Sequence, residues 1–398
     1  MKIAVMTLVY PSRNAAGGAT PVIHYFAREW AAMGHDVTVY HLEARYPFFI
    51  YWMTRLFERS LTSKLGRPVP THRPQEYDEV LDGVNVHHWQ INRYTISQRY
   101  SKRQVDKIFS RICKCADESG APDLFIGHWD SPQLELLNML RAKYPSARNA
   151  LVLHNTRSTL RRSYGEKLQQ LFKNIDIVGF RNKTESERFS RMYFQPHKTF
   201  IAYSGVSSLF IDNAQAKQFD NGIHNYIYVG ALIERKHPRE VLQAVSSAYK
   251  DNDFRLTFVG QGHERTAIES YSRKAGINGN VVLTGRLDRE QIIQHLKQTD
   301  VFVMISESEA FGLVYLEAMA LGCITIGSRG EGIDGVIVDG ENGFLCNPAD
   351  ADNLKEILNT IRTMPPGELQ RISRNAVNTA LKMSDRKVAE SYLDAVTK

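Results

Sequence analysis

Cysteine is scarce in this chain. Four residues, Cys113, Cys115, Cys323 and Cys346, occur among 398, and no pair has the Cys-x-x-Cys spacing. Secreted disulfide frameworks and structural zinc sites need several cysteines at regular short intervals. The sequence therefore predicts neither kind of site, and it fits the reduced environment of the cytosol.

Long apolar runs are also missing. No stretch approaches the roughly 18 consecutive apolar residues that a membrane-spanning helix needs. Met1 and Lys2 lead directly into the short apolar run Ile3 to Met6, so we expect no secretory signal. A cytoplasmic protein is the resulting expectation.

Three familiar ligand-binding motifs are absent or misplaced. The first predicted strand, Lys2 to Val9, is followed by a glycine loop, but the loop has neither Gly-x-Gly-x-x-Gly nor a Walker Gly-Lys-Ser/Thr. The triplet Asp251-Asn252-Asp253 spells a metal-binding Asp-x-Asp, yet it precedes a predicted strand and so lies at the wrong end of the sheet. We interpret the triplet as a turn and expect no catalytic metal.

Charge is divided unevenly along the chain. The formal net charge is +7, and up to Ser204 there are 29 Lys and Arg residues against 18 Asp and Glu, which leaves the remainder acidic. A basic half attracts anionic partners, and nucleic acid, anionic lipid and phosphorylated glycans all fit this description. Solvated surface charge is the alternative interpretation.

Predicted strands alternate with predicted helices over most of the chain, which is typical of an α/β fold with parallel sheets. We expect two doubly wound, Rossmann-like domains that face a central cleft. Residues 1–205 form the first domain and 206–383 the second, and a last helix, 384–398, returns to the first.

The most informative stretch is Ser306 to Gly322. It follows the apolar run Val301 to Ile305 and turns helical from Phe311, so it predicts a strand, a loop and a helix start. Unpaired amides at a helix start bind anions, and Gly312 allows a diphosphate to approach the backbone. Glu317 lies inside an otherwise apolar helix and therefore needs a partner, either a ligand hydroxyl pair or a neighbouring protein group.

This stretch has the form Ser-x-x-Glu-x-Phe-Gly-Leu-x-x-x-Glu-Ala-Met-Ala-x-Gly. It resembles the retaining nucleotide-sugar glycosyltransferases of the GT-B fold, in their family four (glycosyl transferases group 1). In that family the first glutamate contacts the transferred sugar and the second the nucleotide ribose, while the amides between them bind the diphosphate. The resemblance therefore implies a sugar contact for Glu309 and a ribose contact for Glu317, with Phe311, Gly312, Leu313 and Val314 at the diphosphate.

Further matches extend the resemblance to both halves of the chain. Gly17 and Gly18 occupy the first loop, where the family's Gly-Gly faces the donor phosphates and the acceptor. His154 ends a predicted strand, like the family's histidine beside the donor sugar; a structural histidine is the alternative. Arg286 and Leu287 stand at the corner that holds the nucleotide base.

One match is incomplete. The family has an arginine directly after the glycine that ends the first strand of the second domain, and a lysine six residues after that glycine. Lys236 matches the lysine, but Ala231 replaces the arginine, and whether Arg235 takes its place stays open. A lysine ammonium is a suitable point charge for a diphosphate.

The segment Tyr46 to Arg59 is rich in aromatic residues with interleaved arginines. Such a segment is too short and too charged to span a membrane, but it can lie in a membrane interface. It can equally cap the core of the first domain, with Phe48, Phe49, Tyr51 and Trp52 packed inward. Both interpretations stay open at this point.

The resemblance implies a retaining, metal-independent glycosyltransferase, for a hexosyl or N-acetylhexosaminyl group, that takes a nucleotide sugar, with UDP as the expected nucleotide, and needs no cofactor. The expected acceptor is a glycan or lipid-linked glycan, as in cell-surface polysaccharide synthesis. We expect an anionic membrane surface as a partner of the basic half, at the inner face of the membrane, and no nucleic acid. Two alternatives are a catalytically silent nucleotide-sugar-binding protein, suggested by Ala231, and a sugar-nucleotide epimerase of the same fold.

Overall fold

The computed structural model describes residues 1–14, 21–65, 69–94, 100–154 and 159–398. The chain forms two compact units of similar size. The first contains Met1–Glu58, Val69–Ser204 and Asp385–Lys398, and the second contains Arg59–Pro68 and Gly205–Ser384. Of the segment 59–68, residues 59–65 are among those that the structure describes, and they group with the second unit.

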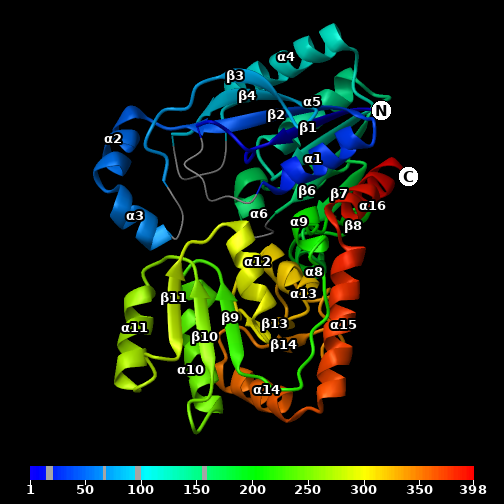
Figure 1. The fold of residues 1–398 in the computed structure, drawn as a ribbon. Helices are drawn as coiled ribbons and strands as arrows, with labels where there is room; N and C mark the ends of the chain where they lie inside the picture. Colours follow the sequence, from blue (N-terminus) through cyan, green and yellow to red (C-terminus); the bar gives the residue numbers. More distant parts are fainter. Residues whose placement is uncertain (15–20, 66–68, 95–99, 155–158) are drawn as a thin grey trace. The chain divides into compact units, whose positions relative to one another are not determined.

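The first unit is built on a sheet with the strand order β3-β4-β2-β1-β5-β6-β7-β8 (Figure 1). Neighbouring strands are parallel except for β3, which pairs antiparallel with β4 at one edge. The strands are β1 (Lys2–Thr7), β2 (Asp36–Arg45), β3 (Tyr77–Leu81), β4 (Val84–Asn92), β5 (Leu124–His128), β6 (Arg148–Leu153), β7 (Ile177–Phe180) and β8 (Thr199–Ile201). The helices are α1 (Val22–Ala32), α2 (Phe48–Leu56), α4 (Lys102–Ser119), α5 (Gln133–Lys143), α6 (Thr159–Tyr164), α7 (Lys167–Phe172), α8 (Lys183–Met192) and α16 (Asp385–Thr397).

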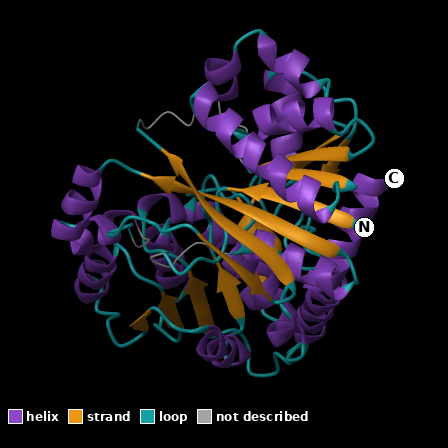
Figure 2. Cartoon of the chain, turned by 90° about the horizontal axis from the view of Figure 1, so that it is seen from above, coloured by secondary structure: helices purple, strands orange, loops and turns teal. Residues whose placement is uncertain are grey.

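Both faces of this sheet are covered by apolar helix surfaces. Side chains alternate along a strand, so Ala4 and Met6 point to one face of β1 while Ile3 and Val5 point to the other. The first face packs against α4, α5, α7 and α8, and the second against α1 and α16. Figure 2 shows helices on both sides of the strands. The fully buried strands explain the uninterrupted apolar runs in the sequence.

The last helix, α16, packs onto the first unit through aromatic residues. Trp30 of α1 donates a hydrogen bond from Nε1 to the Ala389 carbonyl at 3.0 Å. Tyr392 contacts the rings of Phe26 and Trp30, with centroids 5.1 Å away in both cases. A chain segment nearly 360 residues away in sequence therefore completes the core of this unit.

Helix α2 bears on one of the two interpretations of the aromatic segment. Phe48, Phe49 and Trp52 are all exposed, so these three do not pack into the core of the domain as the core-capping alternative supposed. Tyr51 alone of the four is buried. The buried residues of α2 are Tyr51 and Thr54, three positions apart, so the buried side of the helix is a narrow stripe that leaves the other three aromatic residues outside it.

The second unit has a parallel sheet with the order β11-β10-β9-β12-β13-β14. The strands are β9 (Asn225–Val229), β10 (Arg255–Val259), β11 (Val281–Gly285), β12 (Val301–Val303), β13 (Ile324–Ser328) and β14 (Phe344–Cys346). The helices are α9 (Ser208–Ile211), the 3-10 helix η1 (Glu234–Lys236), α10 (Pro238–Ala248), α11 (Arg265–Lys274), α12 (Arg289–Lys297), α13 (Leu313–Ala320), α14 (Ala351–Thr363) and α15 (Pro366–Lys382). One further helix, α3 (Glu58–Leu65), lies where the chain passes between the units.

Each unit is thus a Rossmann-like α/β layer structure, as the alternation of strands and helices predicted. In the part of the chain that the structure describes, no helix has the length and apolar character needed to cross a bilayer.

Candidate active site

The loop between β12 and α13 carries the predicted anion site. Gly312 is the residue before the first turn of α13 and has a φ of 77°, in the left-handed region. A Cβ at this position would lie 2.5 Å from the Tyr315 ring, so only glycine fits. The helix therefore begins at Leu313, two residues later than the sequence suggested. Its first amides, including those of Leu313 and Val314, are positioned to meet an anion.

Two residues predicted from separate motifs meet at this loop. Lys236, at the end of η1, forms an ion pair with Glu309, and both side chains are largely buried. The Glu309 amide donates a hydrogen bond to Glu331 at 2.8 Å, and the Glu307 amide donates one to the Arg235 carbonyl at 2.8 Å. The ends of β9 and β12 are neighbours in the sheet, which explains why segments 70 residues apart come together.

Arg235 differs from its neighbour Lys236. Its side chain is exposed, and its closest polar contact is a long one of 3.5 Å to the Glu307 carbonyl. Ala231 has no charged side chain, and its carbonyl accepts a hydrogen bond from the Tyr228 hydroxyl at 2.9 Å. Lys236 is therefore the cation that this corner holds in place.

Glu317 lies one turn into α13 and forms an ion pair with Arg289 at the start of α12. The Arg289 Nη2 to Glu317 Oε1 distance is 2.6 Å, and the glutamate side chain is only 8% exposed against 39% for the arginine. The guanidinium also lies over the Phe210 ring, 5.0 Å from its centroid. The sequence allowed either a ligand hydroxyl pair or a protein group as the partner of Glu317. In the structure the partner is a protein group, the Arg289 guanidinium.

The corner predicted for the nucleotide base follows β11. Arg286 is exposed and Leu287 is partly buried, immediately before α12. Close backbone contacts fix the adjacent loops: the Gly260 amide donates to the Gly285 carbonyl at 2.8 Å, and a Cβ on Gly262 would lie 2.0 Å from the Leu232 carbonyl oxygen. The loops after β9, β10 and β11 thus form one rigid edge.

In the first unit, His154 belongs to a cluster at the carboxyl ends of neighbouring strands. Its Nε2 lies 3.0 Å from Nδ1 of His128, and its ring stacks on Trp129 at 4.0 Å between centroids. Desolvation holds the pKa values of both histidines well below the usual range, and the nearby Arg181 guanidinium lowers them further. Both rings are therefore neutral at physiological pH, and His154 is suited to hydrogen bonding rather than to carrying charge.

Arg181, at the end of β7, was not anticipated from the sequence. It is buried and bonds the Ser204 hydroxyl, and burial lowers its pKa to about 10, so that it stays cationic. Its other terminal nitrogen, Nη1, has no hydrogen-bond partner in the described part of the chain.

The structure thus unites Lys236 with Glu309, and it gives Glu317 a partner that sequence reasoning missed. Arg289 follows the predicted base-binding residue Leu287 by only two positions, and this closeness in sequence could have marked it as a candidate site residue. Gly17 and Gly18 lie outside the described residues. Asp251 to Asp253 lie in the turn before β10, as predicted. Among the described residues no His, Cys, Asp and Glu side chains group as a metal site would require.

Comparisons with known proteins agree with these observations. Residues 211–379 match the family model described as glycosyl transferases group 1. Over 145 residues, 36% of this chain, the sequence is 32% identical to the N-acetyl-alpha-D-glucosaminyl L-malate synthase of Bacillus anthracis. The match covers 37% of that relative's length, and the separate matches to two further curated relatives cover 42% and 26% of theirs, so this chain matches less than half the length of each.

Solved structures are similar over nearly the whole chain. Sucrose-phosphate synthase from Thermosynechococcus elongatus superimposes with a TM-score of 0.68 at 17% identity, covering 99% of this chain and 97% of that one. Anabaena HepE in complex with UDP and glucose gives a TM-score of 0.65 at 15% identity, covering 100% of this chain and 99% of that one. At such identities the likeness concerns the fold.

Proposed function

We propose, from the match of residues 211–379 to the glycosyl transferases group 1, that the protein transfers a sugar from a nucleotide diphosphate sugar to an acceptor hydroxyl. The observation that carries the proposal is the corner where Lys236 and Glu309 meet beside the start of α13. A buried cation next to free helix amides suits a diphosphate, and an adjacent carboxylate suits sugar hydroxyls.

Donor binding then requires an exchange of partners. In the structure Lys236 is neutralised by Glu309. A diphosphate would take over the ammonium and release the carboxylate toward the sugar. Because charge on the leaving diphosphate increases during transfer, Lys236 and the amides of 311–314 would stabilise the transition state more than the ground state.

Deeper in the same helix, Glu317 is proposed to accept hydrogen bonds from the ribose hydroxyls. Its pairing with Arg289 orients the carboxylate before the nucleotide arrives. Arg286 and Leu287 would border the base, and Arg235 would contribute charge from the rim. Gly17, Gly18 and His154 are proposed to contact the donor from the first unit.

The finer chemistry is also a proposal. Retention of configuration, independence of metal and transfer of a hexosyl or N-acetylhexosaminyl group follow from the family resemblance. UDP is proposed as the nucleotide on the same resemblance; HepE, which has the same fold, was solved in complex with UDP and glucose. A glycan or lipid-linked glycan acceptor, used in cell-surface polysaccharide synthesis at the cytoplasmic face of the membrane, fits the basic first half.

The test is a panel of nucleotide sugars, read by release of nucleotide with and without glycan acceptors and with EDTA throughout. We expect one donor to give acceptor-dependent release. Glu309→Ala should reduce turnover at least about tenfold with nucleotide diphosphate affinity nearly unchanged, which corresponds to about 1.4 kcal/mol or more in the transition state.

Glu307→Ala is the matched control. This glutamate is two residues away, its side chain is 54% exposed, and its backbone bonds do not depend on the side chain. Its activity should stay close to wild type. Binding of nucleotide sugar without any release across the panel would favour the silent binding protein, conversion of the donor sugar to its epimer would favour the epimerase, and recovery of lost activity by manganese would reject metal independence.

A further inference from the structure

Helix α2 has its apolar side turned outward. Six large apolar side chains on this helix and at its end are between 40% and 84% exposed: Phe48, Phe49, Trp52, Met53, Leu56 and Phe57. At about 100° per residue these positions fall within one half of the helix circumference. They form a single continuous surface, which we call the α2 apolar face.

The opposite side of α2 is polar and fixed to the first unit. Tyr51 and Thr54 are its buried residues. The Tyr46 amide donates a hydrogen bond to the Tyr51 hydroxyl at 2.9 Å, and the Thr54 hydroxyl donates one to the Pro70 carbonyl at 2.7 Å. These bonds hold the helix with its apolar face outward, which reverses the usual arrangement of a surface helix.

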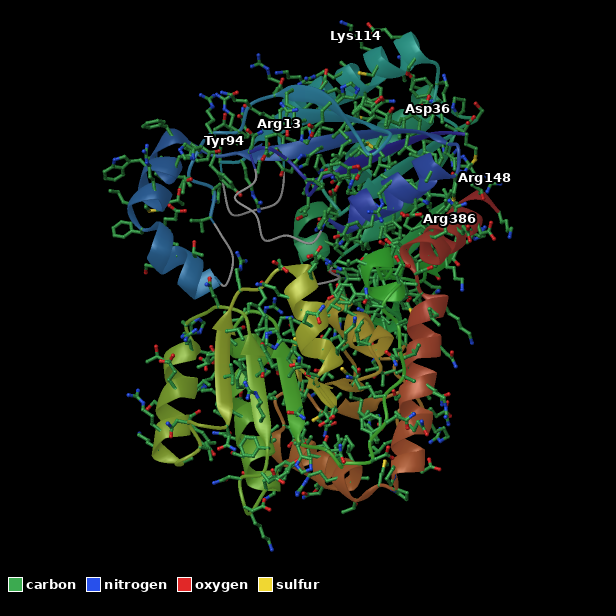
Figure 3. All side chains as sticks on the ribbon, in the orientation of Figure 1. Arg13, Asp36, Tyr94, Lys114, Arg148 and Arg386 are labelled. Atoms are coloured by element: carbon green, nitrogen blue, oxygen red, sulfur yellow. The ribbon has the colours of Figure 1, made fainter. Side chains whose placement is uncertain are left out.

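The charges beside this face are mainly basic, although the exposed Glu58 directly follows its last residue. The segment 44–57 contains no acidic residue, and it carries Arg45 and the exposed Arg55. Arg93 directly follows the neighbouring strand β4, and its amide donates a hydrogen bond to the Arg45 carbonyl at 2.8 Å; the next residue, Tyr94, is 71% exposed. In Figure 3 Tyr94 lies on the same side of the first unit as α2, while Lys114 and Arg148 lie on the other.

We propose that the α2 apolar face docks the protein on an anionic lipid bilayer, with α2 lying in the plane of the headgroups. Exposed Trp, Phe and Tyr side chains beside arginines match the apolar and negatively charged layers of such an interface. Charge complementarity favours lipid over a second copy of this chain, because two α2 faces in contact would bring like charges together. The proposal concerns binding alone and does not depend on the transfer reaction.

Flotation with vesicles tests this inference. The protein is mixed with vesicles of phosphatidylcholine, or of phosphatidylcholine with 30% phosphatidylglycerol, at low salt and at 0.5 M NaCl. Anionic vesicles should bind it at low salt, and a fraction should resist high salt because inserted apolar side chains are not screened. We expect Phe49→Ser/Trp52→Ser to lower that fraction at least about fivefold, and Arg55→Glu to weaken mainly the low-salt binding.

Val80→Ser is the control for loss of exposed apolar surface, because Val80 is 70% exposed on β3 and is not part of the α2 apolar face. It should bind vesicles like the wild type. Trp52 provides a second readout, since the other three tryptophans are buried or partly buried. Its fluorescence should shift to the blue with anionic vesicles, and the shift should disappear in Trp52→Phe.

Several results would overturn the proposal. The wild-type protein could fail to bind anionic vesicles at low salt. Alternatively, the vesicle-bound fraction that resists high salt could be unchanged in a Phe49→Ser/Trp52→Ser variant that keeps the wild-type circular dichroism and melting temperature. Concentration-dependent dimers that this variant abolishes, without vesicle binding by the wild type, would assign the face to a second copy instead. Nucleotide release in solution serves as the separate measure of the proposed transferase function.

Discussion

The ion pair between Arg289 and Glu317 gives a quantitative prediction because its two side chains differ in solvent exposure. The glutamate side chain is 8% exposed and the arginine 39%. Replacing Arg289 with Met removes the cation and leaves a buried carboxylate, whereas replacing Glu317 with Gln leaves an arginine that water can reach. The first change should therefore cost more stability than the second.

The magnitude follows from this exposure. Removing one partner of a fully buried pair costs about 3–5 kcal/mol. Because the guanidinium is partly hydrated already, we expect about 1–3 kcal/mol for Arg289→Met. Glu317→Gln should cost at most about 1 kcal/mol, since the amide oxygen can still accept a hydrogen bond from Arg289. In a unit of this size 1 kcal/mol shifts the melting temperature by about 2–4 °C.

The assay combines calorimetric melting of the ligand-free protein with titration of the nucleotide diphosphate. For nucleotide affinity the order should reverse: Glu317→Gln should weaken binding by about 1–3 kcal/mol through the lost ribose acceptor, and Arg289→Met should weaken it less. Arg265→Met removes an exposed pair with Glu269 one helical turn away and should change stability by less than about 0.5 kcal/mol. Equal melting of Arg289→Met and wild type would refute the stability argument, and unchanged nucleotide affinity in Glu317→Gln would refute the ribose assignment.

Three further predictions concern other parts of the molecule. Lys236→Ala should reduce transfer at least about tenfold more than Arg235→Ala, because only the lysine is buried beside the anion site; steady-state kinetics showing the reverse order would move the phosphate cation by one residue. Gly262→Ala should destabilise the second unit by about 1–3 kcal/mol, because its Cβ would collide with a backbone carbonyl 2.0 Å away, whereas Gly279→Ala, with open space around it, should melt like the wild type. The buried histidines of the first unit have lowered pKa values, so the unfolded chain binds more protons below about pH 6.5 and stability should fall from there toward pH 5; His154→Asn should make that dependence shallower by up to about 1.4 kcal/mol per pH unit, and an unchanged slope in pH-dependent denaturation would contradict the buried neutral state.

The sequence by itself determined the fold class. Apolar runs alternating with helical patterns predicted two doubly wound α/β units, and the GT-B fold implied by the family resemblance is confirmed by similar structures that cover nearly the whole chain. The loop from Ser306 to Gly312 was also recognisable, because a strand, a glycine in the left-handed region and a helix start are local features that short-range sequence pattern encodes.

Tertiary structure alone decided which side chains meet. Lys236 and Glu309 were predicted separately, but their ion pair depends on β9 and β12 being adjacent in the sheet, and strand order is not a local property. Arg289 escaped prediction for the same reason, since its partner Glu317 lies on another helix. The sequence of the aromatic segment did not show whether its side chains are buried or exposed, because its composition fits a domain core and a membrane interface equally well. In the structure, the hydrogen bonds of Tyr51 and Thr54 hold α2 with its apolar face outward.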